Sequence, residues 1–310
     1  MRIIIISIVL IVANIFKISA QNEIEIKGLL VSKENNEVIP FASILDITSY
    51  KHGTTSQEDG TFFLKIPVNK QESNYQIKIA CLGFNDTIIN INSFANNSII
   101  KLSPHVYELL EVVVVARNKS KISYIGLPEG ALLINDKGKK QGLPANTSAG
   151  SSSGVFVKSK NNQKGLLKSI SIYLLEKGFP ETPFSVRILV SPKDKIKHNR
   201  MYSTNAFVDY LKESVIFKGT AGWNIIELED YNIPLPENDY LILFTPLDYG
   251  KKYKWHNEYG EYYGMVIGVY NKKKIPQLFW AFKSQDFYSY DDSPNQLNFT
   301  PAIVINYYNK

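Results

Sequence analysis

Short runs in which apolar and polar residues alternate recur along the first half of the chain. Alternation with a period of two is typical of a half-buried β-strand, because successive side chains point to opposite faces of a sheet. No window in this half keeps apolar residues at helical spacing. Seven such runs within about a hundred residues predict a small β-sandwich. They lie at residues 23–32, 41–48, 61–66, 75–81, 87–91, 98–102 and 109–116.

The second half returns to the same alternation. Ile170, Ile172 and Leu174, for example, are separated by single residues that include serine and tyrosine. Eight or nine short strands at this spacing predict a jelly-roll-like β-sandwich. One short helix is expected at 206–212. The remaining alternating runs lie at 184–190, 214–218, 222–228, 239–245, 264–270, 277–282 and 302–308.

Residues 118–153, between the two halves, have a different composition. Glycine, proline, serine and lysine accumulate there, which predicts a linker or long loop, while residues 131–134 also fit a first strand of the second domain. The run GSSSG at 150–154 has the spacing of a nucleophile elbow. Such an elbow needs a buried parallel strand before it and a helix after it, and neither is expected here. We therefore predict a flexible connector.

Six short motifs stand out in the first half: Gly28, VIPFAS at 38–43, GTTS at 53–56, DGTF at 59–62, CLGF at 81–84 and LEVVV at 110–114. Together they are similar to the carboxypeptidase regulatory-like domain, over about residues 23–117. The resemblance implies a transthyretin-like fold and a protein exported by a Gram-negative bacterium, where this domain often precedes the plug of a TonB-dependent transporter. Too few residues follow for a plug and a barrel, so no transporter is expected.

The predicted fold is therefore all-β, with two sandwiches. A seven-stranded transthyretin-like sandwich is expected at 21–117, a connector at 118–153 and a jelly-roll-like sandwich at 154–310. Within the first motif set, Gln57 stands where the family more often has aspartate, so no cation is expected at that turn. Runs at 182–188, 222–223 and 231–237 more loosely resemble a C-terminal domain that accompanies regulatory-like domains in secreted bacterial proteins of unassigned function. That resemblance transfers no catalytic residue.

The first residues predict a secretory signal peptide at 1–20. Arg2 precedes an apolar run at 3–13 that is shorter than the roughly 20 residues a membrane-spanning helix needs, and the small pair Ser19-Ala20 follows. No later run is long enough to span a bilayer, so the mature chain is expected in the periplasm, associated with the outer membrane, or outside the cell. Cys81, the single cysteine, has no partner for an internal disulfide and is expected to be buried.

Charge and residue clusters favour a binding protein over an enzyme. Loss of Arg2 and Lys17 with the leader lowers the formal charge from +6 by two, to +4, and the lysines are scattered, so no nucleic-acid partner is expected. The four histidines are isolated, so neither a metal site nor a cofactor is expected. The alternatives are a structural component of a surface assembly or a polysaccharide-acting hydrolase with paired acids. The candidate acids are Glu258, Glu261, Asp286, Asp291 and Asp292.

The stretch KYKWHNEYGEYYG at 252–264 is the strongest candidate for a binding surface. Parity along one strand would place Tyr253, Trp255, Tyr259 and Tyr263 on one face. The favoured interpretation is a packed corner of the sandwich, because exposed rings forgo burial energy, and the alternative is a stacking platform for a glycan or an envelope protein. A partner strand could also add at 109–116. The candidate ligand-binding residues are Tyr253, Trp255, Tyr259, Tyr262, Glu258 and Glu261.

Overall fold

The computed structural model is almost entirely β-structure, as the alternation predicts. In the part of the chain that it describes, the one helical element is the short 3-10 turn η4 (Glu229–Tyr231). The signal peptide predicted at 1–20 and the strand predicted at 109–116 lie outside the described residues. These are 23–49, 51–67, 75–91, 94, 98–105, 121–128, 132–135, 137–160, 163–191, 202–203, 207–211, 214–271, 277–283, 286–289 and 300–309.

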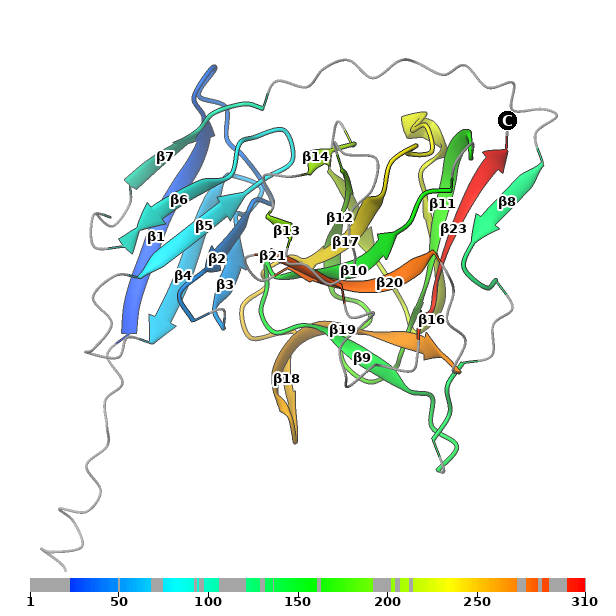
Figure 1. Cartoon of the computed structure of the whole chain (residues 1–310). Helices are drawn as coiled ribbons and strands as arrows, with labels where there is room; N and C mark the ends of the chain where they lie inside the picture. Colours follow the sequence, from blue (N-terminus) through cyan, green and yellow to red (C-terminus); the bar gives the residue numbers. More distant parts are fainter. Residues whose placement is uncertain are drawn as a thin grey trace, which may run out of the picture.

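Within the described residues, the first module is a sandwich of a three-stranded and a four-stranded sheet. The orders are β4-β1-β7 and β3-β2-β5-β6, and β1 runs antiparallel to β4 but parallel to β7 (Figure 1). Alternate residues such as Ile26, Leu30 and Ile79 fill the core between the sheets. The strands are β1 (Glu23–Ser32), β2 (Ser43–Asp46), β3 (Gly53–Thr55), β4 (Thr61–Pro67), β5 (Gln76–Ala80), β6 (Thr87–Asn90) and β7 (Ser98–Leu102).

The second module is a larger sandwich of two antiparallel sheets. One has the order β13-β21-β20-β10-β17-β12-β14 with β15 beside β12, and the other has β18-β19-β11-β23-β8 with β16 beside β11 and with β9 and β22 beside β19 (Figure 1). The strands are β8 (Ile122–Ile125), β9 (Gly142–Asn146), β10 (Ser152–Val157), β11 (Gly165–Leu174), β12 (Pro183–Val190), β13 (Tyr202–Ser203), β14 (Val208–Asp209), β15 (Val215–Lys218), β16 (Gly222–Glu227), β17 (Tyr240–Pro246), β18 (Lys254–Asn257), β19 (Gly260–Tyr270), β20 (Leu278–Lys283), β21 (Asp286–Ser289), β22 (Thr300–Pro301) and β23 (Ile303–Asn309).

The prediction of a linker or long loop at 118–153 is wrong for the described residues of that segment. β8 pairs with β23, β9 pairs with β19, and β10 is a fully buried strand that begins inside the GSSSG run. An added Cβ on Gly154 would lie 1.9 Å from the carbonyl oxygen of Ile242. Gly154 is therefore required because two backbones approach closely, and a glycine- and serine-rich composition alone does not distinguish this packing from a flexible linker.

The prediction of a helix at 206–212 is also wrong for the described residues of that range, 207–211. Phe207 and Leu211 are both buried and four residues apart, which is helical spacing. Instead, β14 pairs with the end of β12, and the Asp209 carboxylate makes a two-pronged ion pair with Arg187, at 2.7 and 3.0 Å. Strand pairing and this buried ion pair, both with β12, override the local spacing.

The two modules are packed against each other. Strand β2 is buried on both faces. One face packs on the core of its own module, so a second surface must cover the other face. The Ser43 hydroxyl donates to the Gly150 carbonyl at 2.5 Å, and an added Cβ on Gly53 would lie 2.5 Å from the carbonyl oxygen of Ala149. At a second contact, Leu82 of the first module joins the core cluster of the second. The outer face of β2 and β3 is therefore an internal interface.

Candidate functional site

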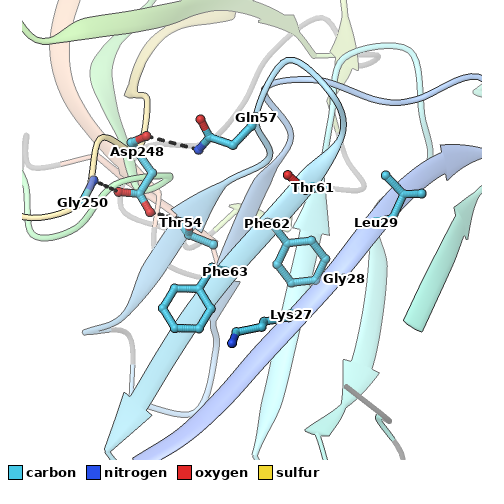
Figure 2. A pocket seen from close by; sticks show the side chains of 10 residues that line it. All are labelled: Lys27, Gly28, Leu29, Thr54, Gln57, Thr61, Phe62, Phe63, Asp248 and Gly250. Carbon is cyan, nitrogen blue, oxygen red and sulfur yellow. Dashed lines mark hydrogen bonds between the residues drawn. The ribbon is translucent and has the colours of Figure 1, made fainter. Parts of the chain in front are cut away.

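The loop that follows β17 connects the modules through Asp248. Its backbone N–H donates to the Thr55 hydroxyl at 2.8 Å, and its carbonyl accepts from the Gln57 amide at 3.3 Å. One carboxylate oxygen accepts the Thr54 hydroxyl, and the other accepts the Gly250 N–H at 2.8 Å (Figure 2). Because every polar group of Asp248 has a partner, and three of these four partners belong to the first module, the loop is held in one position against β3 and the turn after it.

A pocket of about 560 Å³ lies beside this connection. One wall is the outer face of β1 and β4, and the other is the Asp248 loop (Figure 2). Gly28 allows this wall to form, because an added Cβ would lie 2.6 Å from the Phe62 ring packed beneath it. The lining residues are Lys27, Gly28, Leu29, Thr54, Gln57, Thr61, Phe62, Phe63, Asp248 and Gly250.

The β1–β4 wall carries an aromatic ring between two lysines. Phe63 is 40% exposed, and the ammonium groups of Lys27 and Lys65 lie 5.1 and 5.5 Å from the centre of its ring. Glu25 is bound by Lys65 at 2.7 Å and lies 3.6 Å from Lys27. The hydrogen bond and the charge of Lys65, with a smaller contribution from Lys27, hold the pKa of Glu25 below its ordinary value.

A smaller hollow of about 410 Å³ lies on the other side of the contact between Gln57 and Asp248, lined in part by Phe41 and Tyr249. Its Asp59-Gly60 turn has Gly60 at φ 78°, and Asp59 accepts the backbone N–H of Thr61 at 2.9 Å and its hydroxyl at 2.6 Å. These hydrogen bonds lower the pKa of Asp59 and fix Thr61, which lines the larger pocket.

No residue of the aromatic stretch at 252–264 lines the pocket, but two of its tyrosines pack against the loop that carries Asp248. Tyr253 is only 2% exposed and packs edge-on against Phe179, Tyr249 and Tyr263. The Tyr263 hydroxyl accepts the backbone N–H of Tyr249 at 2.8 Å, and burial raises the pKa of this phenol. For Tyr253 and Tyr263, the packed-corner interpretation describes the structure, and both rings support the loop that carries Asp248.

The other predicted residues lie along a hairpin, because 252–264 is not one strand. β18 and β19 are joined by a turn at Glu258 and Tyr259, and β18 projects from the second module (Figure 1). Residues directly opposite each other share a face, so the parity argument across the turn is wrong. Trp255 pairs with Tyr262, with ring centres 5.0 Å apart, and its indole N–H donates to the Gly264 carbonyl at 2.9 Å.

The six candidate residues are therefore not brought together at one site. Tyr253 is in the core, Trp255 and Tyr262 form a half-buried pair, and Tyr259 is 80% exposed at the hairpin turn. Glu258 and Glu261 are exposed on the same hairpin, while Asp291 and Asp292 lie outside the described residues. In the described ranges no group of three or more His, Cys, Asp and Glu side chains is arranged to hold a metal ion.

Sequence reasoning missed the pocket because its two walls come from segments about 190 or more positions apart along the chain. Lys27 and Phe63 read as ordinary outward positions of their strands, and Asp248 as an ordinary loop acid. One signal was present. Gln57 departs from the aspartate that is commoner in the family, and its amide N–H donates to the Asp248 carbonyl, a bond that an aspartate carboxylate cannot donate.

The sequence of the first module matches a known domain family. Residues 26–114 match the model of the CarboxypepD_reg-like domain. The match spans β1 to β7 and confirms the resemblance drawn from the short motifs. The CarboxypepD_reg-like domain is a regulatory, non-catalytic module. No curated protein matches the chain. Across the residues described, no helix is both long and apolar enough to cross a membrane.

Proposed function

We propose that this chain is a non-enzymatic, exported recognition protein that binds a glycan in the pocket between the CarboxypepD_reg-like domain and the second sandwich. The observation that carries the proposal is the pocket itself, lined from both modules and framed by the hydrogen-bonded Asp248. Its volume of about 560 Å³ lies within the range of about 300–1,000 Å³ that is usual for small-ligand sites.

The chemistry of the lining favours a sugar. Gln57 and Thr61 line the pocket with oxygens that can accept hydrogen bonds from sugar hydroxyls, because their own donors are engaged by Asp248 and Asp59. The half-exposed Phe63 ring offers an apolar surface for the C–H face of a sugar. Glycoside cleavage uses two carboxylates. Among the described lining residues one carboxylate is present, Asp248, and both its oxygens already accept hydrogen bonds. This favours binding over hydrolysis.

The proposed location is the envelope or exterior of a Gram-negative bacterium. The apolar leader at 1–20 supports export, and CarboxypepD_reg-like domains are common in exported proteins. In this proposal the domain supplies one wall of the binding site.

A glycan array followed by calorimetry on the purified chain tests the proposal. Phe63→Ala is expected to weaken binding about tenfold, the usual effect of removing an aromatic contact at the centre of a site. Tyr259→Ala is the matched control, because it removes an exposed ring outside the pocket. Thermal unfolding of both variants verifies their fold. A blank array, or binding that is lost with Tyr259→Ala and kept with Phe63→Ala, would refute the pocket as the glycan site.

A second candidate function is protein contact through the β18–β19 hairpin. It is favoured by Tyr259, whose large side chain is left 80% exposed at the turn. Pulldown from envelope extracts with wild type and Tyr259→Ala tests it, and it predicts a partner that only the wild type retains.

A further inference from the structure

We infer that the junction pocket selects a glycan carrying a carboxylate, such as a uronic acid residue, and that the Lys27 ammonium recognises that group. The inference rests on the proposed function, because it names the class of glycan bound at the same site.

Lys27 is the one cationic residue among the described residues that line the pocket. It lies on the outer face of β1, directly opposite Phe63 on β4, and its ammonium is 5.1 Å from the centre of that ring. Its side chain is 52% exposed. A positive charge beside an apolar ring matches an acidic sugar, whose carboxylate projects from the edge of a ring with apolar C–H faces.

The ion pairs beside the pocket leave Lys27 able to bind a ligand. Glu25 is the carboxylate that could neutralise it, but Glu25 is bound by Lys65 at 2.7 Å, and its distance from Lys27 is 3.6 Å. The shorter distance is that of a charge-assisted hydrogen bond, and the longer one is not. Lys65, which also lies against Phe63, does not line the pocket. Lys65 therefore binds Glu25, and Lys27 retains donors for a carboxylate in the pocket.

The opposing charge in the pocket is Asp248. Its two carboxylate oxygens accept the Thr54 hydroxyl and the Gly250 N–H, and these donors offset part of its charge. Figure 2 shows Asp248 and Lys27 at opposite sides of the lining, with the phenylalanine rings nearer to Lys27. A ligand carboxylate beside Lys27 would therefore lie away from Asp248.

Calorimetry with two oligosaccharides of equal length tests the inference: an oligogalacturonate and its neutral galactose counterpart. We expect the wild type to bind the acidic oligosaccharide about tenfold more tightly, in the range of one hydrogen bond to a charged group. Lys27→Gln is expected to remove this preference and to leave neutral binding unchanged. Glu25→Gln is expected to strengthen acidic binding severalfold, because it removes the competing carboxylate. Lys177→Gln is the matched control, because that lysine also lies over an aromatic ring, Trp255, but outside the pocket.

The outcomes separate this inference from the proposed function. Equal binding of both oligosaccharides by the wild type, or an acidic preference that survives Lys27→Gln, would overturn the inference and leave glycan binding intact. Absence of binding to any glycan would overturn both. A peptide ending in a free carboxylate serves as a further probe. If it bound with the same dependence on Lys27 while the oligogalacturonate did not bind, the ligand class inferred here would be wrong.

Discussion

Gly154→Ala distinguishes a packed strand from a flexible linker at the GSSSG run. In the structure the new Cβ would lie 1.9 Å from the carbonyl oxygen of Ile242 and 3.0 Å from the Cα of Leu243. Both contacts are backbone atoms of β17, which pairs with β10 on one side and β12 on the other. Neither atom can move away as the end of a flexible side chain could, so β10 and β17 must separate.

The expected destabilisation is about 3 kcal/mol or more. Overpacking a core costs about 1–3 kcal/mol, and each hydrogen bond lost between β10 and β17 adds about 1 kcal/mol. A flexible linker would give the opposite sign, because alanine in place of glycine restricts the unfolded chain and stabilises by about 0.4–1 kcal/mol where its conformation is tolerated. The two interpretations therefore differ in the direction of the effect.

Urea-induced unfolding followed by tryptophan fluorescence measures this free energy. The unfolding midpoint should fall while the slope with urea stays unchanged, since the surface exposed on unfolding is the same. The control is Thr147→Ala, an exposed position in the same segment that should change stability by less than about 0.5 kcal/mol. A Gly154→Ala midpoint equal to or above the wild-type value would refute the close approach of β10 to β17.

Three further predictions follow from the junction and the buried groups. Asp248→Ala removes two side-chain hydrogen bonds and should cost about 1.5–3 kcal/mol in urea unfolding, with faster proteolysis of the loop after β17; unchanged stability and cleavage would contradict its connecting role. Asp209→Ala leaves Arg187 buried without its partner and should lower the free energy of unfolding by about 3–5 kcal/mol, whereas a loss below about 1 kcal/mol would show that water reaches the site. Burial raises the pKa of the Cys81 thiol from 9.0 to about 11, so the stabilisation that it gives below pH 9 should be lost as pH rises through 11. The difference in Tm between wild type and Cys81→Ala should therefore shrink over that interval, and a constant difference would contradict the shift.

Local alternation was enough to predict strands whose two faces differ. The bounds of β1 and β7 are those predicted, because buried positions alternate with more exposed ones over most of each strand. The short strand β3 was missed, since Gly53-Thr54-Thr55 has no apolar residue to form the pattern. Thr54 and Thr55 are nevertheless buried, because the Asp248 loop bonds to both hydroxyls. That burial comes from a segment far along the chain, which local patterns do not encode.

The binding site was less predictable than the fold for the same reason. The aromatic stretch stood out because its rings are close in sequence, yet Tyr253 and Tyr263 are core residues and Tyr259 is exposed at a hairpin turn. The pocket combines β1, β4 and the loop after β17, so no contiguous window contains it. The one signal in the sequence was Gln57 at a position where aspartate was expected. Its role could not be inferred without knowing that it bonds to the Asp248 carbonyl.

The burial of β2 on both faces has a consequence for how this chain can be divided or recombined. A CarboxypepD_reg-like domain excised from it would expose Leu45 and Ala80, which are now covered, and is expected to aggregate. Replacing it with a related domain would fail unless the substitute also carried hydroxyls matching Gly150 and Asp248. The two modules are therefore expected to be expressed and engineered successfully only as a pair.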